Sequence, residues 1–321
     1  MKIHLPNSAF IHNINSFLKG FNPDNPNILE ITADDKWVFV HPLVVSMVAA
    51  LGLKMGKENV SFQKSPAKSM HYFERIGLFN MLGVDSDIKI EEHEESGRFI
   101  PVTQIRTSEE QSRFISDVIP LLHLKEQYQV QTIVYVLGEL VRNVLEHSES
   151  KHGAIVCAQY YKDSNCIRIG IADTGIGIKA SINASWAAKD HLEAIQLALF
   201  PGITGTTKKV GGTTQNAGAG LFFIKSIAKT NRDYFLIYSG DSMYKLHKAP
   251  QRKRLKLNAD PFDDKHAVVS NLPFWKGTVV GIDITLDQTQ EFDTLMRLFR
   301  DVWSKAVSER KRARYKTPKF S

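Results

Sequence analysis

The stretch GELVRNVLEHSES, residues 138–150, decides how the fold of this chain is interpreted. It belongs to a longer segment, about residues 125–147, whose spacing of apolar residues predicts a helix. On that helix Glu139 and Asn143 are four residues apart, and residues with this spacing are neighbours on one helix face. A carboxylate and an amide that project in the same direction can bind one ligand together.

The composition is that of a globular protein long enough for two packed domains. The chain has 321 residues, 43% of them hydrophobic, and no bias toward disorder or fibres. No apolar run reaches the ~18 residues of a membrane span, and the start MKIHLPNSAF lacks the apolar core of a signal peptide. We therefore expect a cytoplasmic protein without a membrane segment.

The two cysteines, Cys157 and Cys166, fall on neighbouring predicted strands. Small core or sheet positions are the common location of cytosolic cysteines. The sequence therefore supports neither a disulfide framework nor a cysteine metal site.

The first hundred residues alternate strand-like and helix-like stretches, which is an α/β pattern. The polar stretch 85–99 is expected to be a hairpin or linker near the end of this first domain, residues 1–105. The expected strands are 28–32, 37–40 and 60–62, and the expected helices are 43–56 and 69–81.

The remainder of the chain also mixes helices and strands. The expected helices are 108–122, 125–147, 221–228 and 291–311, and the expected strands are 153–161, 166–173, 234–239 and 278–286. Between 174 and 217 the pattern predicts one short helix, 192–200, and otherwise a stretch rich in Gly, Thr and Lys. Such segments tend to be mobile unless a ligand binds them. A long basic insertion is expected between the strands that follow.

Two motifs end or begin strands. In DTGIG, Asp173 ends an apolar strand, and Gly175 and Gly177 permit a tight turn against a ligand. In KGTVVGID, Gly277 and Thr278 begin a strand. Each motif by itself is usually only a turn.

A fourth motif, NAGAGL, precedes a helix. Gly218 and Gly220, followed by Leu221, stand where the free N–H groups of the first turn can hold phosphate oxygens. This signal is also weak alone. The order of all four motifs along the chain is far more specific than any one of them.

That order resembles the GHKL superfamily of ATP-binding domains, which includes gyrase B, the MutL repair proteins, the heat-shock 90 chaperones and the histidine kinases. The resemblance covers about residues 108–288. It implies a Bergerat-type fold, an α/β two-layer sandwich with a mixed sheet covered by helices on one face. The expected domains are then 106–290 for ATP binding and 291–321 for a C-terminal helix and basic tail.

The resemblance implies roles for the polar residues. Asn143 would bind Mg²⁺, a hard cation that prefers oxygen ligands, and Glu139 would be the general base. Asp173 would accept a hydrogen bond from the adenine amino group, with support from Thr278.

The glycine-rich segments would contact the nucleotide. Gly175, Gly177, Gly218, Gly220 and Leu221 are the candidates, and residues 178–217 would form a lid over ATP. Lys208 and Lys209 either reach the γ-phosphate from this lid or are ordinary solvated lysines.

The chain departs from the family near Asn143. Glu146 stands where histidine kinases commonly have a basic residue. A carboxylate there would repel phosphate, so it is expected to turn away, or else the lid and the metal hold the phosphates. His147 is expected to be packed, and Arg142 to point off the Glu139/Asn143 face into solvent.

The first domain resembles, much less closely, the STAS fold, the small α/β regulatory fold of anti-sigma-factor antagonists. The stretches that carry this resemblance are VFVHPLVVSMVAAL and YFERIGLFNMLG. His41 and Pro42 stand where STAS switches have a phosphorylatable Ser or Thr. We therefore expect a protein-binding or an intramolecular docking role rather than a phosphorylation switch.

The positive charge lies mainly in the C-terminal part. Residues 1–105 hold ten Lys/Arg against twelve Asp/Glu, whereas the whole chain has a net charge of +7. Segments 244–256 and 308–321 each contain six Lys/Arg. They are either solvated segments or sites that bind nucleic acid through its phosphates.

Three functions are consistent with this sequence. The first is a regulatory ATPase that binds Mg-ATP under a mobile lid, hydrolyses it, and couples the nucleotide state to a partner protein or to dimerisation. The second is a kinase of the same fold that phosphorylates Ser or His on a separate protein. The third is an interaction module that binds ATP without hydrolysing it.

Overall fold

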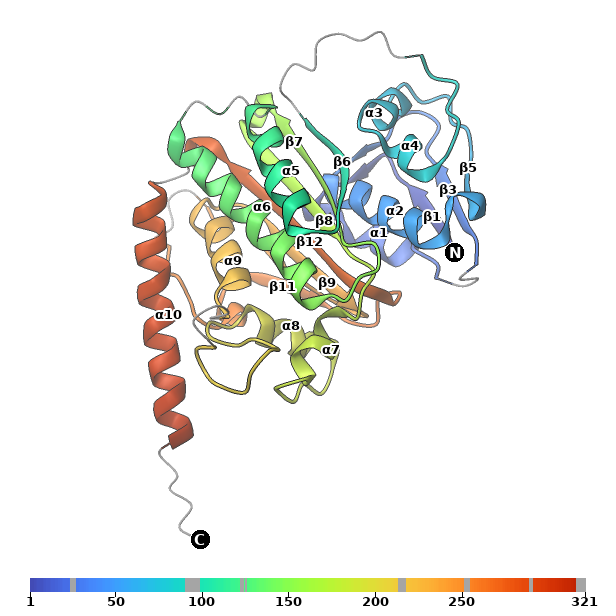
Figure 1. The fold of residues 1–321 in the computed structure, drawn as a ribbon. Helices are drawn as coiled ribbons and strands as arrows, with labels where there is room; N and C mark the ends of the chain where they lie inside the picture. Colours follow the sequence, from blue (N-terminus) through green and yellow to red (C-terminus); the bar gives the residue numbers. More distant parts are fainter. Residues whose placement is uncertain are drawn as a thin grey trace.

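The computed structural model describes the whole chain apart from a few short segments. The described residues are 1–23, 27–89, 99–121, 124, 126–212, 218–250, 255–288 and 291–315. They form an α/β protein built on one large antiparallel sheet, with a smaller parallel sheet in the N-terminal part (Figure 1).

The large sheet has seven strands in the order β11-β10-β9-β12-β8-β7-β6. Its strands are β6 (Phe99–Ile105), β7 (Ala154–Tyr161), β8 (Cys166–Ala172), β9 (Phe235–Gly240), β10 (Ser242–Leu246), β11 (His266–Val269) and β12 (Trp275–Thr285). All its neighbouring pairs are antiparallel, so the expectation of a mixed sheet is wrong for the described strands. The reason is the place of β12: β8 and β9 run in the same direction, but β12 lies between them and is antiparallel to both.

Helices from residue 108 onward cover one face of this sheet (Figure 1). They are α5 (Ser108–Leu121), α6 (Gln127–His147), α7 (Gly177–Asn183), α8 (His191–Leu199), α9 (Gly220–Thr230) and α10 (Phe292–Tyr315). In α6 a stripe of apolar side chains, among them Val136, Leu140 and Val144, is buried in the core beneath these helices. This burial fixes the rotation of α6 and therefore the direction of its polar residues.

The opposite face is covered by α2 (Pro42–Met55) of the N-terminal part. A side chain at Gly170, in the middle of β8, would overlap the backbone of Leu43. The Ser46 hydroxyl donates a hydrogen bond to the Gly170 carbonyl at 3.0 Å. The sheet thus has helices on both faces, and the close approach of α2 depends on a glycine.

The N-terminal part adds a small sheet of its own. Strands β1 (Lys2–Leu5), β3 (Leu29–Ala33) and β5 (Val60–Phe62) are parallel, in the order β1-β3-β5, and β2 (Ser8–Ala9) pairs with β4 (Phe39–Val40). The other helices here are α1 (Asn15–Gly20), α3 (Met70–Arg75) and α4 (Leu78–Leu82). The single helix expected over 69–81 is two helices, because Gly77 adopts a left-handed conformation (φ +79°) between them.

A buried polar contact joins the N-terminal part to the large sheet. His41 precedes α2 and accepts a hydrogen bond from the Leu43 N–H through Nδ1, at 3.0 Å. Its Nε2 lies 3.0 Å from Oδ1 of Asp283 on β12. His41 is fully buried, and burial lowers the pKa of its imidazole.

Part of the expected basic insertion is a strand. The residues of β10 are all buried, and Lys245 among them donates to the His12 carbonyl and to Asn15 Oδ1, both at 3.3 Å. This part of segment 244–256 therefore holds the sheet against the N-terminal part, although residues 251–254 lie outside the described residues. Residues 90–98 of the expected hairpin or linker, and 316–321 of the basic tail, also lie outside them.

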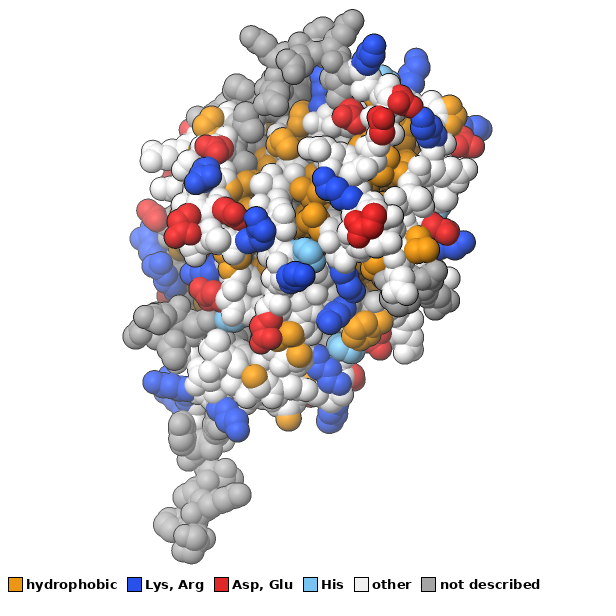
Figure 2. Space-filling model, turned by 45° about the vertical axis from the view of Figure 1, so that its right-hand side comes forward, with side chains coloured by type: hydrophobic (Ala, Val, Ile, Leu, Met, Phe, Trp, Pro, Cys, Tyr) orange, Lys and Arg blue, Asp and Glu red, His pale blue; other side chains and the backbone are white. Residues whose placement is uncertain are grey.

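The remaining expectations concern cysteines, surface charge and membrane segments. Cys157 and Cys166 are buried on the neighbouring strands β7 and β8, as predicted. Acidic and basic side chains are interspersed over the face shown in Figure 2. Over the described ranges, every helix is too short or too polar to cross a membrane.

Candidate functional site

A cavity of about 230 Å³ opens between α6, the ends of β8 and β12, α7 and the start of α9. It collects most of the residues singled out in the sequence. Those that line it are Glu139, Asn143, Asp173, Gly177, Gly218, Gly220, Leu221 and Thr278. The segments that contribute them are far apart in the sequence, so their convergence is a property of the fold.

Asp173 forms the deep end of the cavity. Its side chain is almost completely buried, and its oxygens accept hydrogen bonds from the backbone N–H groups of Gly175 (2.8 Å) and Thr278 (3.2 Å). Burial raises the pKa of this carboxyl to about 7, although the two N–H donors oppose the rise. A buried acceptor whose protonation changes near neutral pH is an uncommon feature in a structural position.

Gly175 supports a residue of the cavity without lining the cavity itself. It does not belong to the lining residues, and a side chain there would overlap the carbonyl oxygen of Ser148 at the end of α6. Its N–H holds Asp173, and the neighbouring Ile176 N–H donates to the Ser148 carbonyl at 2.7 Å. Gly175 therefore positions Asp173 instead of contacting a ligand directly.

Two further residues that sequence reasoning missed support Asp173. The indole N–H of Trp275 donates to the Asp173 carbonyl at 3.0 Å. The Ser239 hydroxyl donates to the Gly277 carbonyl at 2.7 Å and accepts from the Ile178 N–H at 3.0 Å. A Trp and a Ser next to strand ends carry no motif signal, so only the strand pairing could reveal these contacts.

At the other end of the cavity, Glu139 lies against the first turn of α9. A side chain at Gly220 would overlap the Oε2 atom of Glu139, so the absence of a side chain there leaves room for the carboxylate. The Glu139 side chain is only 12% exposed. One turn along α6, the Nδ2 atom of Asn143 is buried and has no hydrogen-bond partner among the described residues. A buried amide in that condition is costly unless a ligand satisfies it.

Arg142 does not point away from this face as expected. Its Nη2 donates to Glu139 Oε2 at 2.6 Å, and the side chain lines the cavity while remaining 47% exposed. The physical reason is that residues three apart on a helix are neighbours, and the long arginine side chain can reach back to its neighbour. Burial raises the pKa of Glu139, and the Arg142 charge partly offsets that rise.

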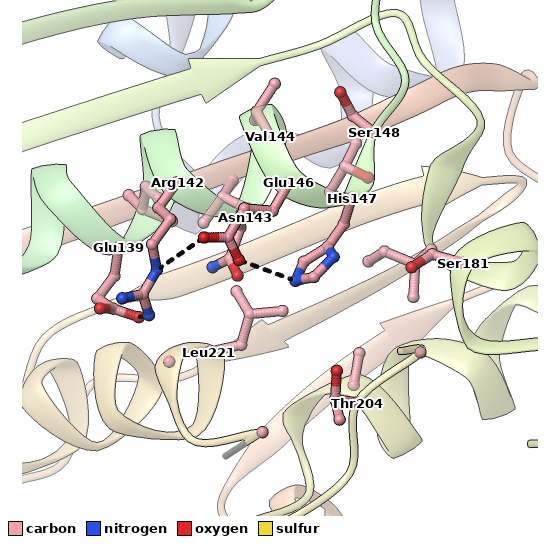
Figure 3. Close-up of a pocket in the computed structure, with 18 of the residues that line it drawn as sticks. Glu139, Arg142, Asn143, Val144, Glu146, His147, Ser148, Ser181, Thr204 and Leu221 are labelled. Carbon is pink, nitrogen blue, oxygen red and sulfur yellow. Dashed lines mark hydrogen bonds and ion pairs between the residues drawn. The ribbon is translucent and has the colours of Figure 1, made fainter. Parts of the chain in front are cut away.

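Glu146 and His147 complete this wall of the cavity (Figure 3). Glu146 Oε1 lies 3.9 Å from Arg142 Nε, and its Oε2 lies 3.8 Å from His147 Nε2. Of the two alternatives for Glu146, the structure does not support the first, that it turns away; the second, that the lid and the metal hold the phosphates, stays a prediction. His147 is largely buried, which lowers the pKa of its imidazole, and it also borders the cavity.

Within its described residues, the segment expected to form the lid contains two helices, not one. Gly177 (φ +78°) begins α7 a few residues after the end of β8, and the apolar side chains of Ile178 and Ile182 bury that helix against the core. After α8 the chain makes a turn whose residues 203–205 line the cavity. Lys208 and Lys209 are exposed and do not line it, and residues 213–217 lie outside the described residues.

The turn that follows α8 rests on the C-terminal helix. A side chain at Gly202 would overlap Cγ2 of Val307 on α10. The Gly202 N–H donates to the Gly218 carbonyl, and its carbonyl accepts from the Gly211 N–H, both at 2.9 Å. Helix α10 therefore supports a turn that includes part of the cavity wall.

The polar groups divide the cavity into two chemically different ends. One end offers the hydrogen-bond acceptor of Asp173, and the other offers an amide, two glutamates, an arginine and the start of a helix. In the part of the chain that the structure describes, no group of three or more His, Cys, Asp or Glu side chains is arranged to hold a metal ion by itself. A metal at this site would need oxygens from its ligand as well as from Asn143.

The chain was compared with known families and proteins. No family model matches the sequence, and no curated protein matches it.

Proposed function

We propose that this protein has a variant of the Bergerat-type ATP-binding fold of the GHKL kind, with an antiparallel instead of a mixed sheet over the described strands, and that it binds ATP with Mg²⁺ in the cavity. The observation that carries the proposal is the convergence of Glu139, Asn143, Asp173 and Thr278, with the two glycines of the NAGAGL motif, on one cavity. The four-motif order of the sequence supports the same assignment.

Asp173 is suited to recognise adenine. A carboxylate accepts hydrogen bonds and, when ionised, donates none, so it favours the amino group of adenine over the carbonyl of guanine at the same place. Its oxygens are already oriented by the N–H groups of Gly175 and Thr278. The base would therefore bind at the deep end, with the phosphates toward α9.

The other end suits phosphate and magnesium. Asn143 has a buried amide with an unused donor, and turned over it would present its oxygen to a cation. The first turn of α9, with Gly220 at its start, has backbone N–H groups for phosphate oxygens. Magnesium, when bound, would neutralise phosphate charge next to the glutamates.

Glu139 is the candidate general base of a hydrolytic reaction. Its carboxylate lies in the cavity beside the helix start, and burial raises its pKa, which makes it a better proton acceptor. The contact with Arg142 has the opposite effect and favours a second candidate function, an ATP-dependent interaction module that does not hydrolyse its nucleotide. Phosphate release by the wild type and by Glu139→Gln separates the two functions.

We infer that the part of residues 1–105 that precedes β6 is a STAS-like docking unit whose helix α2 packs on the sheet of this ATP-binding fold. The expected boundary at residue 105 falls too late, because β6 (Phe99–Ile105) is the edge strand of the large sheet and pairs with β7. His41 and Pro42 stand at the start of α2, and His41 is buried against Asp283. A docking role is supported by this contact. A phosphorylation switch at this place has no exposed hydroxyl group to act on.

Calorimetry on the full chain tests the binding proposal. ATP with Mg²⁺ is titrated into the wild type, Asp173→Asn and Asn143→Ala, with Asp163→Asn, an exposed aspartate in the turn between β7 and β8, as a matched control. We expect the two cavity variants to bind about tenfold or more weakly and the control to be unchanged. Absence of heat with the wild type would refute the proposal.

A further inference from the structure

Resting on the proposed ATP site, we propose that Arg142 recognises the terminal phosphate of a nucleoside triphosphate and exchanges its contact with Glu139 for that phosphate. Arg142 would then set the preference for triphosphate over diphosphate. The exchange would also leave Glu139 free of the guanidinium only when a triphosphate is bound.

Charge balance in the cavity points to this residue. Three carboxylates border the cavity, those of Glu139, Glu146 and Asp173. Over the described ranges, Arg142 is the one Lys or Arg among the lining residues, since Lys208 and Lys209 are exposed outside it. A polyphosphate entering this cavity needs positive charge close to it, and Arg142 is the side chain placed to supply it.

The position of Arg142 suits an exchange of partners. Its guanidinium lies between two carboxylates of the same helix face, with Nη2 at 2.6 Å from Glu139 Oε2 and Nε at 3.9 Å from Glu146 Oε1 (Figure 3). The arginine is half exposed, whereas Glu139 is nearly buried. Leaving the Glu139 carboxylate without its cation costs free energy because that carboxylate is nearly buried, so Arg142 should leave it only for a stronger partner.

The chemistry of the two partners favours phosphate. A guanidinium has five N–H donors in a planar fork, which binds phosphate oxygens through two parallel hydrogen bonds. A terminal phosphate offers three oxygens and more negative charge than a carboxylate. Lysine at this position would keep the charge but lose the paired geometry.

The first test compares nucleotides that differ only in the terminal phosphate. Affinities of the full chain for ADP and for a non-hydrolysable triphosphate analogue with an imido bridge, both with Mg²⁺, are measured by calorimetry for the wild type, Arg142→Gln and Arg142→Lys. We expect Arg142→Gln to weaken analogue binding about tenfold or more and ADP binding less than about threefold. The affinity of Arg142→Lys for the analogue should lie between that of the wild type and that of Arg142→Gln. Arg113→Gln, which removes the same charge from the exposed face of α5, is the matched control and should change neither affinity.

The second test is a double-mutant cycle with Glu139→Gln. If Arg142 must leave Glu139 to bind phosphate, Glu139→Gln tightens analogue binding in the wild-type background and does so much less in the Arg142→Gln background. If Glu139 merely repels the phosphates, the gain is equal or larger in the Arg142→Gln background, because the carboxylate is then unmasked. That second pattern would overturn the proposal.

The outcomes also separate this inference from the proposed function. Nucleotide binding with equal losses for ADP and the analogue in Arg142→Gln, or with no loss, would overturn the role of Arg142 and leave the ATP site intact. Absence of binding of either nucleotide to the wild type would refute both the role of Arg142 and the proposed ATP site. Thermal unfolding of each variant shows whether the fold is retained, and Arg142→Lys gives an independent result if Arg142→Gln does not fold.

Discussion

Asp173 and Thr278 hold each other by two reciprocal hydrogen bonds. The Asp173 N–H donates to the Thr278 carbonyl at 2.9 Å, and the Thr278 N–H donates to Asp173 Oδ2 at 3.2 Å. The two residues lie at adjoining ends of the antiparallel strands β8 and β12. The carboxyl group is therefore oriented by the sheet itself, in advance of any ligand.

The buried carboxyl of Asp173 should make stability depend on pH. Its pKa is about 7 in the folded protein and about 3.9 in an unfolded chain, so between these values the folded state binds more protons. The free energy of unfolding therefore falls as pH rises through this range. We expect the stability of the wild type relative to Asp173→Asn to fall by about 3 kcal/mol between pH 5 and pH 8. Urea unfolding of both proteins measures it, and a constant difference would contradict the expectation.

If the protein hydrolyses ATP as proposed, Gly220→Ala should impair this reaction by displacing Glu139. The new Cβ would overlap Glu139 Oε2, and the flexible glutamate can move aside while the fold is retained. Because misplacing a catalytic group is costly, we expect phosphate release to fall roughly 10- to 100-fold. Gly138→Ala, one residue before Glu139 and with its nearest atom at 3.8 Å, is the control and should keep its activity. Equal rates in the two variants would argue against Glu139 as the base.

Gly170→Ala should loosen the packing of α2 on the sheet. The Cβ would overlap the backbone of Leu43, which cannot move without shifting the helix. Overpacking of this kind lowers the free energy of unfolding by about 1–3 kcal/mol and occasionally more, and we expect a loss of about 3 kcal/mol here. Gly20→Ala at the end of α1, where a Cβ meets nothing within 4 Å, is the comparison. A urea midpoint for Gly170→Ala equal to that of Gly20→Ala would show that α2 tolerates displacement.

His41 should make the same interface sensitive to acid. Burial is the largest cause that lowers its pKa, and Asp283 opposes it. The unfolded chain then binds more protons than the folded one, so stability is retained above about pH 6.5 and is lost as pH falls through that value. His41→Asn keeps a side chain that can cap α2 but cannot titrate. We expect the wild type to lose stability relative to this variant between pH 7 and pH 5, as followed by thermal unfolding.

The sequence predicted the long, strongly patterned elements well. Strands β7 and β8 and helix α6 lie within a few residues of their expected bounds, because apolar periodicity and turn residues define them locally. Strands β1, β2, β6, β10 and β11 were missed. All of them except β6 are short, and β10 leads directly into a basic run, so partners distant in the chain determine their structure.

The candidate site was predicted in its residues but not in its contacts. Spacing on a helix placed Glu139 and Asn143 together, yet it gave no sign that Arg142 turns back onto Glu139. The choice of side-chain rotamer depends on the cavity around it. Likewise, the role of Gly175 as a support for Asp173 depends on the end of α6, which packs against that glycine.

Because of Val307, the smallest fragment of the chain that could keep this cavity must include most of α10. Its side chain packs on the glycines of the turn after α8, and Arg310 stacks its guanidinium on the ring of Phe200, 4.0 Å from the ring centre. A protein cut at residue 290 would expose that turn to water. Any fragment intended to report on the cavity should therefore extend to at least residue 311.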